Sequence, residues 1–264
     1  MGIYAITGAA SGIGAATTKR LKSDGHTVIG IDIQEADIVA DLSKPSGRAE
    51  AIEQVLEKSG GSLEGFIPCA GVMGLPNRAG SLLVSLNYFG AIDLLKGFRE
   101  ALSQGESAAA VGVSSNSTTI SPGVPNSLIQ ACLEGDEEKA CKMADDFGSM
   151  LAYPATKTAL AYWIRRHAVT PEWIGSGINL NAIAPGMIET AMTAEGLADP
   201  LIGPHIKNLI VPTKRPGKPE EIADFLAFLL GPKGRFFVGS ILFCDGGTDA
   251  EIRPDAWPSP MPTP

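Results

Sequence analysis

The sequence contains few of the residues that build disulfide frameworks or metal sites. Its 264 residues include only four cysteines and three histidines. None of them is paired at the close spacing typical of metal ligands; they are Cys69, Cys132, Cys141, Cys244, His26, His167 and His205. This pattern predicts reduced, intracellular thiols and no metal site.

Positive charge is also scarce and never clustered. The net charge is -8 and the sequence pI is near 5.0, and the chain has no run of Lys or Arg. Nucleic acid and anionic membranes are therefore not expected as partners. No apolar run is long enough to span a bilayer. Met1 to Thr7 reads directly as a strand and lacks the charged start of a leader peptide, so we expect a cytoplasmic protein.

What the chain does contain is an alternation of short apolar runs with longer helical patterns, and 44% of its residues are hydrophobic. Strands are expected at 3–7, 28–33, 38–40, 66–69, 108–114, 178–184 and 241–244. Helices are expected at 13–23, 46–58, 81–102, 153–168 and 220–230. This order predicts an α/β fold with a doubly wound parallel sheet of the Rossmann type. We expect a single domain over residues 1–252 and an irregular, proline-rich tail over 253–264.

Two segments depart from this alternation. Residues 116–150 begin with polar and turn residues and continue with a helical pattern, and so long a loop without structure would be unusual. We therefore expect a small helical insertion before Tyr153. Residues 187–212 combine Gly and Pro with apolar side chains, which predicts a mobile substrate loop for an apolar ligand. Packing of these apolar side chains onto the sheet is an equally good interpretation.

A glycine-rich turn joins the first strand to the first helix. Gly8, Gly12 and Gly14 follow the spacing G-x-x-x-G-x-G, with Ser11 and Ile13 between them. Backbone N–H groups at such a helix start favour phosphate, and glycine lets a pyrophosphate approach closely. The turn therefore predicts a dinucleotide site, although an ordinary glycine-rich turn is the alternative.

Further residues at strand ends complete the predicted dinucleotide site. Asp32 ends the second strand, where a carboxylate accepts hydrogen bonds from ribose hydroxyls and repels a 2′-phosphate. Ile33 follows with no basic residue nearby, so NAD is favoured over NADP; the alternative is a solvated acid at a strand end. Further candidates for cofactor contact are Asp41 and Leu42, near adenine, and the small residues Cys69, Ala70 and Gly71.

Tyr153 and Lys157 form a Tyr-x-x-x-Lys tetrad. Residues four apart share one face of a helix, so this pair can deliver or remove a proton beside the dinucleotide. Tyr162 and Arg166 have the same offset, but they lie outside the aligned motifs and are interpreted as helix packing.

In this order, the motifs resemble the short-chain dehydrogenase/reductase family over nearly the whole chain. The residues that carry the resemblance are Thr7–Gly14, Cys69–Gly71, Asn87, Ser114-Ser115, Tyr153-x-x-x-Lys157, Asn181–Gly186, Arg215-x-Gly217-x-Pro219-Glu220 and Asp245–Gly247. Within that family the chain is most similar to the bacterial 3α-hydroxysteroid dehydrogenase/carbonyl reductases. The similarity includes the Gly30–Ile33 strand end, Asn87–Gly90 and the inserted helical segment.

The resemblance implies a role for each catalytic candidate. Tyr153 would be the general acid/base, and the Lys157 ammonium would lower its pKa toward working pH. Lys157 would also reach the nicotinamide ribose. Ser115, the second serine of its pair, would bind the substrate oxygen. Asn87 would support a water relay behind the lysine, unless its side chain simply bonds to the backbone.

The resemblance also includes Pro185 and Gly186, at the end of the sixth strand, among the cofactor-binding residues and places Ile188 and Thr190 at the nicotinamide. For Thr190, helix capping is the alternative. The implied activity is NAD-dependent hydride transfer to or from a small apolar secondary alcohol or ketone, such as a steroid, an aryl alcohol or a cyclic ketone. An aryl or allylic alcohol dehydrogenase of the coniferyl-alcohol type and a non-catalytic dinucleotide-binding regulator remain alternatives. A homo-oligomer, dimer or tetramer, is expected, with the insertion redirecting its contacts.

Overall fold

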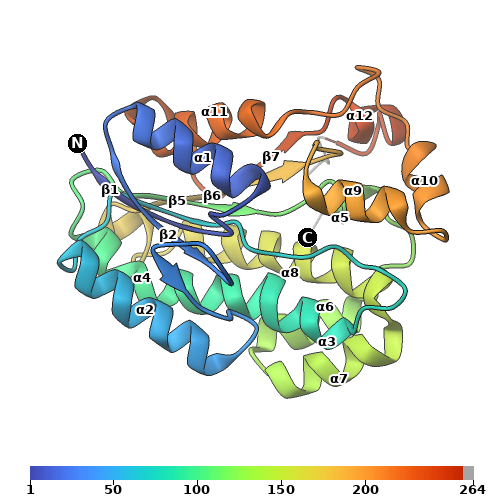
Figure 1. Cartoon of the computed structure of the whole chain (residues 1–264), viewed down its shortest axis with the longest axis horizontal. Coiled ribbons are helices and arrows are strands. Elements are labelled where there is room, and N and C mark those ends of the chain that lie inside the picture. Colours follow the sequence, from blue (N-terminus) through green and yellow to red (C-terminus); the bar gives the residue numbers. More distant parts are fainter. Residues whose placement is uncertain (258–264) are drawn as a thin grey trace, which may run out of the picture.

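The computed structural model describes residues 1–257, which form one parallel sheet with helices on both faces (Figure 1). The sheet has seven strands in the order β3-β2-β1-β4-β5-β6-β7. Their bounds are β1 Ile3–Thr7, β2 Thr27–Asp32, β3 Ile38–Val39, β4 Gly65–Pro68, β5 Ala109–Val113, β6 Asn179–Pro185 and β7 Ile241–Cys244. All seven predicted strands are present, and the doubly wound α/β fold is confirmed.

The strand order reverses beside β1, and this reversal determines where a ligand can bind. The chain runs outward from β1 to β3 and then returns to β4 on the other side of β1. Ile6 of β1 lies opposite Gly30 of β2 on one side and Ile67 of β4 on the other. Helices leave these strands in opposite directions, so a crevice opens at the carboxyl ends of β1 and β4.

The two faces of the sheet are covered by separate helix layers (Figure 1). Helices α1 (Gly12–Ser23) and α11 (Pro219–Leu230) pack against each other on one face. The other face carries α2 (Pro45–Ser59), α4 (Gly90–Ser103) and α8 (Ser149–Ala168). Each layer contributes its own cluster of buried apolar side chains, because strands of a doubly wound sheet bury both faces.

The long helix expected over 81–102 is divided into three segments. Helix α3 (Gly80–Leu83) runs into the π-helical turn η1 (Val84–Phe89), and α4 follows. A π-helical turn widens a helix locally and often marks a functional site. Here the turn contains the buried Asn87, whose side chain bonds to both backbone groups of Val72, at 2.9 Å from the Val72 N–H and 2.8 Å to its carbonyl.

The predicted insertion consists of short helices that precede α8. They are α5 (Ser117–Ile120), α6 (Asn126–Glu134) and α7 (Glu137–Phe147). Both α6 and α7 pack on α8, and α7 also contacts α3 and η1. The buried Arg48 guanidinium ties the insertion to the main fold, because it lies 2.8 Å from Asp93 on α4 and 2.8 Å from Glu137 on α7.

The remaining segments follow β6. The predicted substrate loop contains α9 (Ala191–Ala198) and α10 (Gly203–Lys207), and α12 (Thr248–Ile252) follows β7. The short turns η2 (Ile174–Ser176) and η3 (Pro232–Gly234) lie between larger elements. Of the expected irregular tail, residues 253–257 form no helix or strand, and 258–264 lie outside the described residues. Within the described part of the chain, no helix has the length and apolar character needed to cross a bilayer.

Candidate active site

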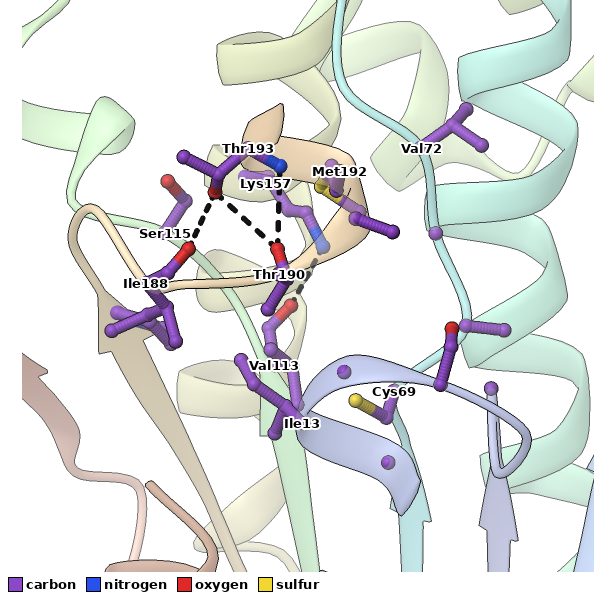
Figure 2. A pocket seen from close by; sticks show the side chains of 18 of the residues that line it. Ile13, Cys69, Val72, Val113, Ser115, Lys157, Ile188, Thr190, Met192 and Thr193 are labelled. Carbon is purple, nitrogen blue, oxygen red and sulfur yellow. Dashed lines mark hydrogen bonds between the residues drawn. The ribbon is translucent and has the colours of Figure 1, made fainter. Parts of the chain in front are cut away.

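One cavity opens at the switch point of the sheet, and most of the predicted site residues line it (Figure 2). Its walls come from the β1–α1 turn, the ends of β4, β5 and β6, and the helices α8 and α9. The predicted residues among its lining are Gly8, Ser11, Gly12, Ile13, Gly14, Cys69, Ala70, Gly71, Ser115, Tyr153, Lys157, Pro185, Gly186, Ile188 and Thr190. Lys157 is the one charged side chain among the described residues that line it.

The glycine turn forms a tight backbone cradle at one end of this cavity. Gly8 and Gly12 have φ values of +68° and +52°, a region that side chains disfavour. A Cβ on Gly14 would lie 2.0 Å from the Gly8 carbonyl oxygen, so only glycine allows helix α1 to approach the turn this closely. The first turn of α1 carries no acidic residue, so its N–H groups are suited to a phosphate.

Four of the predicted cofactor residues lie beyond the lining of this cavity, at the ends of β2 and β3. The Asp32 carboxylate accepts hydrogen bonds from the backbone N–H groups of Ala10 (3.0 Å) and Ile33 (2.7 Å). It is thus held beside the glycine turn, where a ribose would follow a bound pyrophosphate. Asp41 instead accepts from Ser43, which lowers the pKa of its carboxyl group. Leu42 is buried against the helix segment at Gly90.

At the other end of the cavity, Ser115 and Tyr153 meet from different elements. Ser115 follows β5, and it lines the cavity together with Tyr153 of α8. The Ser117 N–H donates to the Ser115 Oγ at 3.1 Å and orients it. Ser114 also borders the cavity, but its Oγ donates to the Lys157 carbonyl at 3.0 Å and joins β5 to α8. This geometry favours Ser115 as the serine available to a ligand.

Lys157 lies one helical turn after Tyr153. Its Nζ donates to the Val113 carbonyl at 2.8 Å and lies 5.9 Å from the centre of the Tyr153 ring. Burial disfavours the charged ammonium and lowers the pKa of Lys157 to about 8. Lys157 therefore still carries a positive charge in neutral solution.

The expected lowering of the Tyr153 pKa by this ammonium is wrong. Burial raises the pKa of the phenol above its ordinary value, and the hydrogen bond from Ser115 offsets this only in part. The reason is that the buried cavity penalises the phenolate more than its neighbours stabilise it. Tyr153 therefore keeps its proton in neutral solution.

Thr190 has the helix-capping contact that the sequence left as an alternative. Its side chain accepts from the Thr193 N–H at 3.3 Å at the start of α9, and the Thr193 hydroxyl donates to the Ile188 carbonyl at 2.6 Å (Figure 2). Gly186 packs against Asp245, where a Cβ would approach to 2.6 Å. These contacts place the β6–α9 connection over the cavity.

The cavity lining also includes residues that were not assigned to the site one by one, namely Val72, Val113 and Ser114, and the α9 residues Ala191, Met192 and Thr193, which lie within the predicted substrate loop. Val72 follows the recognised motif that ends at Gly71, and Val113 precedes Ser114-Ser115. Extending each motif by one residue would have included them. The composition of residues 187–212 predicted a substrate loop, but only the folding of α9 over the cavity shows which of its side chains line it. Asn87 does not line the cavity; it acts on its wall through Val72. Residues 1–257 contain no group of three or more His, Cys, Asp or Glu side chains placed to hold a metal ion.

Comparisons with known proteins agree with this geometry. Residues 3–125 match the short chain dehydrogenase family, and residues 142–249 match the family described as enoyl-(acyl carrier protein) reductase. The chain is 40% identical to 3-alpha-hydroxysteroid dehydrogenase/carbonyl reductase of Comamonas testosteroni, over 96% of this chain and 99% of that protein. It is 29% identical to coniferyl-alcohol dehydrogenase of Pseudomonas sp. (strain HR199 / DSM 7063), over 92% and 94% of the two chains.

A solved structure extends the similarity to three dimensions. The crystal structure of 3-alpha-hydroxysteroid dehydrogenase from Pseudomonas sp. B-0831 in complex with NADH superposes with a TM-score of 0.92. Its sequence is 45% identical, and the match covers 97% of this chain and 100% of that one.

Proposed function

Because the chain belongs to the short-chain dehydrogenase/reductase family, we propose that it is an NAD(H)-dependent oxidoreductase acting on an apolar secondary alcohol or ketone. One observation carries the proposal: a backbone cradle suited to a dinucleotide and a Ser115–Tyr153–Lys157 cluster lie at opposite ends of one cavity. Identity of 40% to a 3-alpha-hydroxysteroid dehydrogenase/carbonyl reductase supports the same reaction class.

The residues of the cavity fit NAD(H) in three places. The cradle formed by Gly8, Gly12 and Gly14 would hold the pyrophosphate. Asp32 would accept hydrogen bonds from the adenosine ribose and repel a 2′-phosphate, and the NADH complex of the related structure supports this choice. Lys157 would bond to the nicotinamide ribose. When bound, the nicotinamide supplies or accepts the hydride at the substrate carbon.

The chain's own residues would handle the proton. Tyr153 holds its proton in neutral solution because burial raises its pKa, so it can donate that proton to the oxygen of a ketone being reduced. Ser115 would hydrogen-bond to the same oxygen and keep it beside the phenol. Donation would leave Tyr153 as a phenolate, with the Lys157 Nζ 5.9 Å from the centre of its ring. In alcohol oxidation the same phenolate would take the proton back.

Asn87 fits a positioning role in this scheme. Both polar groups of its side chain are used by the Val72 backbone, so the backbone-bonded alternative describes the observed contacts. Asn87 would hold Val72 in place as part of the cavity wall. Because Asn87 lies in the π-helical turn η1, this turn would also set the position of that wall relative to the nicotinamide end of the cavity.

The substrate end of the cavity favours an uncharged apolar ligand. Val72 and Met192 supply its apolar walls (Figure 2). A steroid, an aryl alcohol or a cyclic ketone would suit these walls. A dehydrogenase of the coniferyl-alcohol type remains the second enzymatic candidate because of the 29% identity over most of the chain. A non-catalytic regulator would bind NADH tightly and turn over no carbonyl compound.

A tyrosine substitution tests the proposal. Tyr153→Phe removes the phenol oxygen and should abolish NADH-dependent reduction across a panel of ketosteroids, aryl ketones and cyclic diketones, while NADH binding stays nearly unchanged. Tyr162→Phe is the matched control, because Tyr162 lies on the same helix and is 44% exposed. Substantial turnover by the Tyr153→Phe variant would refute the assigned proton donor.

We also propose a cytoplasmic homo-oligomer. The insertion helices α6 and α7 pack on α8, and apolar side chains are exposed on α11, on β7 and between them. Phe228 of α11, the fully exposed Phe236 and Phe243 of the edge strand β7 are 39%, 102% and 36% exposed. A dimer formed through this surface would bury them. The free cysteines in residues 1–257 suit a reducing compartment.

A further inference from the structure

The substrate end of the cavity lies between two walls that differ in how firmly they are held. One wall is the segment between β4 and α3. Its start is fixed where Asn87 bonds to both backbone groups of Val72, and its middle is fixed where the Ser149 hydroxyl donates to the Leu75 carbonyl. This segment is thus anchored to both η1 and α8.

The opposite wall is helix α9, which has few contacts. Gly196 is its one buried residue, and the helix packs chiefly on α10. Met192, from its first turn, faces the cavity across from Val72 (Figure 2). A short helix with so little buried surface is a low-stability part of a fold. Contacts that join α9 to the fixed wall should therefore have a measurable effect on its position.

Arg78 makes such a contact with both walls at once. Its Nη1 donates to the Met73 carbonyl at 2.6 Å, and its Nη2 lies 2.8 Å from the Glu195 carboxylate on α9. The Arg78 side chain is 17% exposed and that of Glu195 is 49% exposed. A guanidinium suits this task because its planar group donates in two directions.

The ion pair coincides with a close approach of the two walls. A Cβ on Gly196 would lie 2.7 Å from the Met73 Cε, 2.8 Å from the Met73 Sδ and 2.7 Å from the Ile206 Cδ1. The Met73 thioether therefore lies directly against the α9 backbone at Gly196, and a larger residue there would displace the side-chain end of Met73 or Ile206. Arg78 bonds to the Met73 carbonyl and to the side chain of Glu195, which is the neighbour of Gly196. Both of its contacts therefore lie next to this close approach.

We propose that Arg78 is a positioning residue of the substrate site, acting with Glu195. The pair keeps α9 and Met73 together and so determines the width of the cleft that receives the apolar substrate. Arg78 touches neither the cradle nor the Ser115–Tyr153–Lys157 cluster, so its effect falls on substrate affinity and not on proton transfer. The inference rests on the proposed function and identifies the residues that shape its substrate cleft.

A double-mutant cycle tests the pair. The variants are Arg78→Met, Glu195→Gln and their combination, with Glu138→Gln on the exposed face of α7 as the control for loss of one surface carboxylate. Each single change should raise the KM for the ketone by about two- to five-fold, the range expected for a partly exposed ion pair, and leave kcat within about two-fold. The combined variant should show little further change. About 1 M KCl should raise the wild-type KM toward that of the variants.

A second measurement separates this inference from the proposed activity. Hydrogen exchange of residues 187–207 should be faster in Arg78→Met and Glu195→Gln than in the wild type and in Glu138→Gln, whether or not a substrate is known. An absence of turnover by the wild type would refute the proposed function and leave this test intact. Unchanged exchange, a wild-type KM in Glu195→Gln, or additive effects in the combined variant would overturn the assignment of Arg78.

Discussion

Replacing Lys157 by Met should stabilise the protein while abolishing its activity. Burial lowers the pKa of this ammonium from 10.5 to about 8, so below that pH the folded state holds a cation that the cavity disfavours. A shift of this size corresponds to about 3 kcal/mol at about 1.4 kcal/mol per pH unit. The hydrogen bond from Nζ to the Val113 carbonyl offsets about 1 kcal/mol or somewhat more of it. Methionine keeps most of the apolar stem.

The net gain at pH 7 should be about 1–2 kcal/mol, which is a rise in Tm of about 3–6 °C for a chain of this size. The gain should depend on pH. Because the folded pKa lies below the unfolded one, the unfolded chain binds more protons between pH 8 and 10.5, and wild-type stability rises with pH across this window. At pH 10 the penalty on Lys157 falls to about 1 kcal/mol, so the two proteins should then have similar stability.

Thermal denaturation of both proteins at pH 7 and pH 10 measures this difference. Lys58→Met is the control, since Lys58 is exposed near the end of α2 and its substitution should change stability by less than about 0.5 kcal/mol at either pH. Steady-state assays should find no turnover in Lys157→Met, as expected where a strained site trades stability for function. The reasoning would be refuted if Lys157→Met were less stable than the wild type at pH 7, or if the difference in stability between the two proteins did not change with pH.

Two further predictions concern Arg48 and Asp32. Arg48→Ala should destabilise the fold by about 3 kcal/mol in urea denaturation, because it leaves the carboxylates of Asp93 and Glu137 without the buried guanidinium that joins α2, α4 and α7; a loss below about 1 kcal/mol would contradict this role. The ratio of kcat/KM for NADH to that for NADPH should be well above one, because Asp32 would repel a 2′-phosphate, and Asp32→Ser should reduce this ratio; a wild-type preference for NADPH would contradict the assignment of Asp32.

The local patterns were sufficient for most of the fold. Apolar runs such as Ile3–Thr7 and Ala109–Val113 are buried strands, and these produced the correct number of strands and their parallel arrangement. The π-helical turn at Val84–Phe89 was not predicted, because the apolar periodicity of a helix hardly changes when one residue is accommodated in a wider turn. The start of α8 at Ser149 was missed because α7 ends only two residues earlier, and Gly148 alone separates them.

In the candidate site, too, some features could be predicted from the sequence and others could not. Gly14, Tyr153 and Lys157 were recognised because the chemistry of each is encoded within a few neighbouring residues. The raised pKa of Tyr153 was not, because it depends on desolvation of the phenol by segments that are remote in the chain. Arg78 and Glu195 are separated by 117 positions, and no local motif connects them.

By itself, the sequence determined the doubly wound fold, the glycine turn and the Tyr-x-x-x-Lys pair, since periodicity, turn chemistry and helical spacing are properties of short segments. The tertiary structure alone decided which side chains face the cavity, how burial raises one pKa and lowers another, and which walls an arginine joins. Those properties depend on distances between segments remote in the chain and on the exclusion of water, and both arise only when the layers pack.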